Sequence, residues 1–174
     1  MGCIKMKQKN LWILSGIPGS GKSTFLKNRW PQCGCVVSRD ALRFQMLNDD
    51  ESYFAKEESV WHAFVEAITL SLRDYDDVYA DATHLGPGSR KKLLKAINAK
   101  GYANLNVNVI YFNVPVEVCI ERNKQRDGRA QVPEEVIRSM ANSFTPPTFK
   151  EYIKYNLIQE VNEKGEVIHT WQSF

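Results

Sequence analysis

The chain has 174 residues, of which 43% are hydrophobic and 25% are charged, and its formal net charge is +3. A chain of this length suits one domain with a full core and is too short for two. No apolar run approaches the roughly 20 residues that a membrane span needs, and the first residues lack the apolar centre of a signal peptide. We therefore expect one domain over residues 1–174, cytoplasmic and without membrane contact.

The cysteines and histidines do not form a metal-binding motif. Cysteines stand at positions 3, 33, 35 and 119, and histidines at positions 62, 84 and 169. None of these spacings is Cys-x-x-Cys, so free thiols are the main expectation for a cytosolic chain. The alternative is that Cys33 and Cys35 contribute to a metal site with distant partners.

The first predicted element is a short apolar strand, residues 11–14, that leads into a glycine-rich loop. The loop, GIPGSGKST, has the phosphate-binding pattern of Gly, four residues and Gly-Lys-Ser/Thr, and a predicted helix follows it. Glycines let backbone N–H groups converge on an anion, and the helix adds the positive end of its dipole. We expect Lys22 to reach the β- and γ-phosphates of ATP and the Ser23 hydroxyl to bind Mg²⁺. The expected nucleotide-binding residues of the loop are Gly16, Gly19, Ser20, Gly21, Lys22, Ser23 and Thr24.

A second short strand, residues 35–38, is followed by a carboxylate and an arginine, Asp40 and Arg43. Three residues apart at the start of a predicted helix, they share a face and lie about one turn from each other. The carboxyl end of a strand is where open α/β sheets bind ligands, so Asp40 could accept the proton of an attacking hydroxyl and Arg43 could hold an anionic group of that substrate. The alternative is that Asp40 caps the helix and pairs with Arg43 or Arg39.

A helix over residues 53–72 and a third strand over residues 77–83 come next. Apolar residues recur at helical spacing in the first segment, and His62 on the neighbouring face is expected at the surface. The strand ends in Asp81, where nucleotide-binding proteins place a carboxylate that is linked to magnesium through water. Asp81 and Thr83 are therefore candidate substrate-binding residues. The alternative is that Asp81 caps the following helix.

A helix over residues 86–100 stops at Gly101, and a fourth strand covers residues 105–114. Cationic residues of this helix, among them Arg90 and Lys91, are expected to be solvated surface.

The segment 122–146 predicts a small helical lid. Arg122 and Arg126 share a helix face, Arg129 follows in a glycine turn, and a second helix begins near Pro133. Arginines on a lid that closes over phosphates would offset the charge on a transferring phosphoryl group. The alternative is that they are surface arginines paired with neighbouring carboxylates.

Two strands, within residues 154–161 and 165–171, are joined by a turn and complete the chain. The elements together predict a three-layer α/β domain with a parallel sheet in the order 2-3-1-4-5 and a small helical lid.

With GIPGSGKST, SRDALR, the strand end DAT, and RNKQRDGR before VPEEVIRSM in this order, the chain resembles the kinase domain of phage-type polynucleotide 5′-hydroxyl kinases, within the P-loop kinases. The resemblance covers about residues 11–144. It implies that Asp40 is the general base for a 5′-hydroxyl and that Arg43 binds the 3′-side phosphate of the acceptor. It also implies that Asp81 organises the site and that Arg126, with Arg122 and Arg129 nearby, contacts the donor phosphates.

The function expected from these residues is transfer of the γ-phosphoryl group of ATP, with Mg²⁺, to the 5′-hydroxyl end of DNA or RNA. Lys22, Asp40 and Arg126 are the candidate catalytic residues. Two alternatives stay open: a P-loop kinase for another hydroxyl, such as a modified base, a tRNA-linked group, a nucleoside, a sugar or an antibiotic, and a nucleotide-dependent binding module without an acceptor. No protein partner can be inferred.

Overall fold

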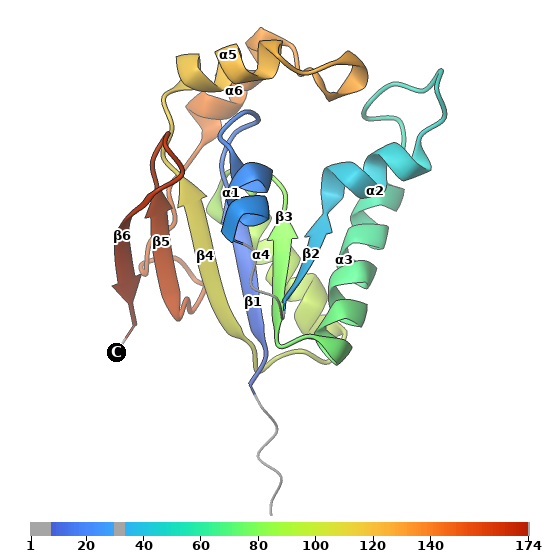
Figure 1. Ribbon diagram of the computed structural model, residues 1–174. Coiled ribbons are helices and arrows are strands. Elements are labelled where there is room, and N and C mark those ends of the chain that lie inside the picture. The colour runs from blue at the N-terminus through green and yellow to red at the C-terminus, as the bar shows by residue number, and fades with distance from the viewer. Residues whose placement is uncertain (1–7, 30–33, 174) are drawn as a thin grey trace, which may run out of the picture.

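The computed structural model describes residues 8–29 and 34–173. Its elements alternate between strand and helix for most of the chain, as Figure 1 shows. The strands are β1 (Asn10–Ser15), β2 (Gly34–Ser38), β3 (Asp77–Asp81), β4 (Asn106–Phe112), β5 (Leu157–Val161) and β6 (Val167–Gln172). The helices are α1 (Lys22–Arg29), α2 (Arg39–Met46), α3 (Glu57–Asp74), α4 (Pro87–Ala99), α5 (Val116–Lys124) and α6 (Glu134–Ser143), with a short 3₁₀ turn, η1 (Gly128–Ala130).

The strands form one sheet in the order β2-β3-β1-β4-β5-β6. Pairs among the first five are parallel, and β6 pairs antiparallel with β5. The predicted order 2-3-1-4-5 is therefore confirmed, and the last hairpin extends the sheet at its β5 edge. Because the parallel strands all end at one edge, the residues that follow them gather there.

Helices cover both faces of the sheet, which confirms the three-layer architecture (Figure 1). Leu11 and Ile13 of β1 point to a core shared with α3 and α4, and Leu14 points to a second core with Phe25 and Leu26 of α1. This alternation is the period of two that a strand imposes. The helices α5 and α6 lie across the carboxyl edge of the sheet, above the loop between β1 and α1 (Figure 1).

Two sequence predictions need correction. The helix predicted over residues 53–72 begins at Glu57, because Tyr53 and Phe54 form part of a turn whose rings pack edge to face. The acidic residues Glu57 and Glu58 then occupy the first helical turn, where the helix dipole favours negative charge. Arg90, expected on a solvated face of α4, is fully buried.

None of the helices in residues 8–29 and 34–173 is long and apolar enough to cross a membrane. Cys35 and Cys119 are free thiols, whereas Cys3 and Cys33 lie outside the described residues, so the alternative metal site at positions 33 and 35 is not tested. Within the described residues, no group of three or more His, Cys, Asp or Glu side chains could hold a metal ion.

Candidate active site

The glycine-rich loop between β1 and α1 has a backbone that only glycine adopts without strain at two positions. Gly19 and Gly21 have φ angles of 82° and 93°. A Cβ atom on Gly19 would lie 2.2 Å from the backbone oxygen of Cys119 in α5, so the loop and that helix are in direct contact. A Cβ on Gly21 would meet only Arg122, at 3.6 Å. The loop therefore leaves a side-chain-free concavity at the start of α1, which fits a polyphosphate.

Lys22 and Ser23, the first residues of α1, face this concavity. The Lys22 ammonium donates to the carbonyl oxygens of Gly16 and Ile17, at 2.8 and 2.9 Å, so it lies at the mouth of the loop. The Ser23 hydroxyl donates to a carboxylate oxygen of Asp81, at 2.8 Å. A serine hydroxyl beside a carboxylate suits Mg²⁺, which binds few protein oxygens and takes the rest of its ligands from water and phosphate. These donors fit a nucleoside triphosphate with magnesium.

Burial shifts the pKa values of Lys22 and Asp81. Burial lowers the pKa of Lys22, and the nearby charge of Asp81 partly opposes that change. Burial likewise raises the pKa of Asp81, against the attraction of Lys22 and the hydrogen bond from Ser23. The alternative in which Asp81 caps the helix α4 is wrong, because the residue at the N-cap of α4 is Gly86.

Asp40 lies in the first turn of α2 and accepts two hydrogen bonds on the same oxygen. The Arg43 guanidinium and the Tyr53 hydroxyl both donate to Oδ1 of Asp40, each at 2.6 Å. Arg43 also donates to Glu57 at 2.7 Å, and Arg39 forms an ion pair with the other oxygen of Glu57. The Asp40 side chain remains 61% exposed, so its carboxylate is oriented by these neighbours and still open to a substrate.

Of the two alternative roles predicted for Asp40, the structure excludes helix capping and contains the ion pair with Arg43. Ser38 caps α2 by accepting a hydrogen bond from the backbone of Ala41, so Asp40 is not the cap. The expected pairing of Asp40 with Arg43 is present. The Arg43 side chain is only 5% exposed, and a substrate phosphate would have to compete with Asp40 and Glu57 for it.

One cavity of about 490 Å³ joins the loop, Asp40 and the lid. Its polar lining includes Lys22, Ser23, Asp40, Asp81 and Arg126. Its apolar lining comes from α2 and the turn after it, and from the lid. These residues are Phe44, Tyr53 and Phe54 on the first side, and Val132, Pro133, Val136 and Met140 on the second.

Most of the predicted site residues therefore meet in one place. Gly19, Gly21, Thr24, Arg43 and Thr83 also line the cavity. Gly16 and Ser20 belong to the same loop, and the Gly16 amide donates to the backbone oxygen of Thr83 at 2.9 Å.

The segment predicted as a lid, residues 122–146, holds the end of α5, then η1 and α6, and the name lid is used below for α5, η1 and α6 together. Its body packs on the loop, because Ile17 clusters with Cys119 and Ile120 of α5 and with Ile137 of α6. Arg126 lies beyond α5 and is exposed at the cavity. Arg122 donates to the backbone oxygen of Glu163, at 2.5 Å, and to that of Gly19 in the loop, at 3.5 Å. The side chain of Arg129 lies outside the described part of the structure.

Sequence reasoning missed two groups of residues. The aromatic side of the cavity, Tyr53 and Phe54, was assigned to a helix, and no local pattern distinguishes those rings from core residues. Arg90 was assigned to the surface, although it shares the spacing i, i+3, i+4 and i+7 with Leu93, Leu94 and Ile97, which form the buried stripe of α4. That spacing was a signal for burial.

Known structures with a similar fold include a chain of an RNA repair complex and a fungal RNA kinase. A chain in the Pnkp1/Rnl/Hen1 RNA repair complex superimposes with a TM-score of 0.63 at 24% identity, covering 80% of this chain and 45% of that one. A fungal RNA kinase superimposes with a TM-score of 0.62 at 16% identity, covering 89% and 74%. At these identities, the similarity concerns the fold.

Among curated proteins, the L-seryl-tRNA(Sec) kinase of Methanococcus maripaludis is 28% identical over 146 residues. The alignment covers 80% of this chain and 54% of the relative, so the chain spans about half of that protein's length. A family model for an AAA domain (AAA_33) matches residues 11–147, which include the loop, Asp40, Asp81 and the lid. Because that match spans well over half of the chain, the protein belongs to this AAA domain family.

Proposed function

We propose that the protein transfers the γ-phosphoryl group of ATP to a hydroxyl, and that the preferred acceptor is the 5′-hydroxyl end of a nucleic acid. The observation that carries the proposal is that Asp40 and Lys22 line one cavity. Apolar side chains from α2 and the turn after it, and from the lid, line the same cavity. A carboxylate and a phosphate-binding loop in the same cavity can bring a hydroxyl and a phosphoryl group together.

On the donor side, the loop amides and Lys22 would hold the β- and γ-phosphates, and Ser23 with Asp81 would hold Mg²⁺. When bound, the magnesium ion offsets negative charge on the phosphate oxygens. Arg126, exposed at the cavity beyond α5, supplies a further positive charge for the transferring group.

On the acceptor side, Asp40 would orient the hydroxyl and accept its proton. A bond forms between the acceptor oxygen and the γ-phosphorus, the bond from that phosphorus to the bridging oxygen breaks, and ADP leaves. Arg43 and Tyr53 occupy one oxygen of Asp40, which fixes the direction of the carboxylate for this step.

The walls of the cavity favour a nucleotide over a polyol as acceptor. Phe44, Tyr53 and Phe54 offer aromatic surface, and Val132 and Met140 offer aliphatic surface. A nucleobase has flat faces that stack on such side chains, which favours a nucleotide acceptor over a polyol that has no such faces.

The test is transfer of label from γ-labelled ATP, with Mg²⁺, to an oligonucleotide with a 5′-hydroxyl, beside the same oligonucleotide with a 5′-phosphate. We expect label only on the free 5′ end. Asp40→Asn keeps the size of the side chain and removes the base, so kcat should fall by about 100-fold or more. Full activity of Asp40→Asn would refute the role of Asp40, and equal labelling of both oligonucleotides would refute an end-directed reaction.

A second candidate acceptor is a hydroxyl carried by a tRNA. The alignment with the L-seryl-tRNA(Sec) kinase, over 80% of this chain, favours it. Seryl-tRNA therefore belongs in the same assay, with uncharged tRNA as its control. Label on seryl-tRNA, and none on either oligonucleotide, would select this acceptor and leave the donor side of the proposal unchanged.

A further inference from the structure

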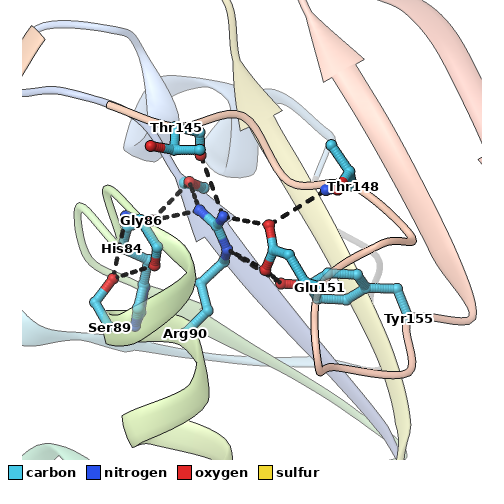
Figure 2. Close-up of polar contacts among 9 residues, drawn as sticks. His84, Gly86, Ser89, Arg90, Thr145, Thr148, Glu151 and Tyr155 are labelled. Atoms are coloured by element: carbon cyan, nitrogen blue, oxygen red, sulfur yellow. Dashed lines mark hydrogen bonds and ion pairs between the residues drawn. The ribbon is translucent and has the colours of Figure 1, made fainter. Parts of the chain in front are cut away.

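Arg90 of α4 is a fully buried cation with partners on every side (Figure 2). Its guanidinium donates to both carboxylate oxygens of Glu151, the nearer at 2.6 Å, and to the hydroxyl of Tyr155 at 3.1 Å. It also donates to the Ser15 hydroxyl at 3.3 Å and to the backbone oxygen of His84 at 3.0 Å. A buried charge with its donors this fully used is held in one orientation.

The partners of Arg90 belong to three segments that are distant in sequence. Ser15 ends β1 and directly precedes the phosphate-binding loop. His84 lies in the connection between β3 and α4, three residues after Asp81. The third segment follows the lid: Arg90 donates to the backbone oxygen of Thr145 at 3.1 Å, two residues after the end of α6. Figure 2 shows these segments converging on the guanidinium.

Backbone contacts reinforce the same junction. The Thr145 amide donates to the backbone oxygen of Leu85 at 2.8 Å, and the Ser15 hydroxyl donates to that of His84 at 2.8 Å. The exit of the lid, the segment around Thr145 that follows α6, is thus joined to the ends of β1 and β3, which carry the loop and Asp81. At the other end of the lid, α5 packs on Gly19 through the backbone of Cys119.

With both ends of the lid attached, the part left to move is the exposed tip between α5 and α6, which carries Arg126. The base of that tip is tied to the lid, because the Asn123 side chain donates to the backbone oxygen of Val132 and accepts from its amide, so the tip follows the position of α5 and α6. The geometry points to Arg90 as a positioning residue for the proposed phosphoryl transfer: it fixes the exit of the lid against the base of the phosphate-binding loop, so that Arg126 reaches the donor phosphates. This inference rests on the proposed function for its kinetic test only.

The test needs variants that lose the junction and keep the fold. The double variant Arg90→Met with Glu151→Leu removes both charges and retains apolar volume, a replacement that is often neutral for stability. Arg90→Lys keeps a positive charge for Glu151 but lacks the planar set of donors that reaches three segments. Lys100→Met is the matched control, because it breaks an exposed ion pair with Glu66 next to the same helix.

Two measurements separate positioning from stability once circular dichroism and thermal unfolding show that a variant is folded. The first is tryptic cleavage after Arg126 with Mg²⁺ and a non-hydrolysable ATP analogue: wild type and Lys100→Met should be protected, and the Arg90 variants should not. The second is kinetics: kcat should fall by up to about 100-fold, as misplacement of a distant catalytic group can cause, with the acceptor KM unchanged.

A folded Arg90 variant with wild-type protection and kcat would overturn the inference. So would failure of both variants to fold, because Arg90 would then serve stability alone. If wild type phosphorylates no acceptor, the proposed function fails, and the protection assay still decides the role of Arg90. Absence of protection in the wild type would refute closure of the tip over the nucleotide and, with it, the inference.

Discussion

His84 provides the clearest quantitative test of the structure, because it is a buried histidine that must stay neutral. It lies beneath the phosphate-binding loop with Nδ1 3.1 Å from the backbone oxygen of Leu14. Burial, followed by the positive charges of Arg90, Arg39 and Lys22, lowers its pKa from 6.5 to about 3. The folded protein therefore binds no proton at His84 at pH values where the unfolded chain does.

The size of the effect follows from proton linkage. The contribution of His84 to stability is complete above the unfolded pKa of 6.5 and is lost as the pH falls toward the folded pKa of about 3. Each pH unit between these values costs about 1.4 kcal/mol. Between pH 7 and pH 5, the free energy of unfolding should drop by about 2 kcal/mol because of this residue alone.

The assay is urea unfolding at pH 7 and pH 5 for the wild type and for His84→Asn. Asparagine tolerates the φ angle of 39° at this position better than most residues. The control is His62→Asn, since the side chain of His62 is 74% exposed. We expect the wild type and the control to lose about 2 kcal/mol more than His84→Asn between the two pH values. An equal loss in all three proteins would refute the buried, neutral state of His84.

Two further predictions concern the loop and the base. Gly19→Ala places a Cβ 2.2 Å from the Cys119 oxygen at a φ of 82°, so thermal unfolding should report a loss of at least about 1–2 kcal/mol, whereas Gly86→Ala, with nothing within 4 Å of its Cβ, should change little. Equal midpoints for the two variants would contradict the contact between loop and helix. Tyr53→Phe removes one donor to Asp40 and should lower kcat about tenfold with the fold intact. This is the rate loss expected when the free energy of one hydrogen bond to a charged group is lost from the transition state. An unchanged kcat in the labelling assay would show that Arg43 alone orients the carboxylate.

Local sequence was sufficient for the parts of the site that depend on the backbone. The loop from Gly16 to Thr24 was predicted because positive φ angles at Gly19 and Gly21 and a helix start at Lys22 are encoded within these nine residues. The parallel sheet with helices on both faces followed in the same way from apolar runs separated by helices, since parallel neighbours need crossover connections. Asp40 and Asp81 were candidates because each stands at or just past the end of such a strand.

Only the tertiary structure decided the neighbours of these groups. Tyr53 is 13 residues from Asp40 along the chain and reaches it because the turn before α3 folds back over α2. Arg90 is buried because Glu151, 61 residues later, supplies the opposite charge that its burial requires. A sequence pattern records which side chain faces inward on its own helix. Whether a charge can stay there depends on partners that meet it only after folding, because an unpaired charge is too costly to bury.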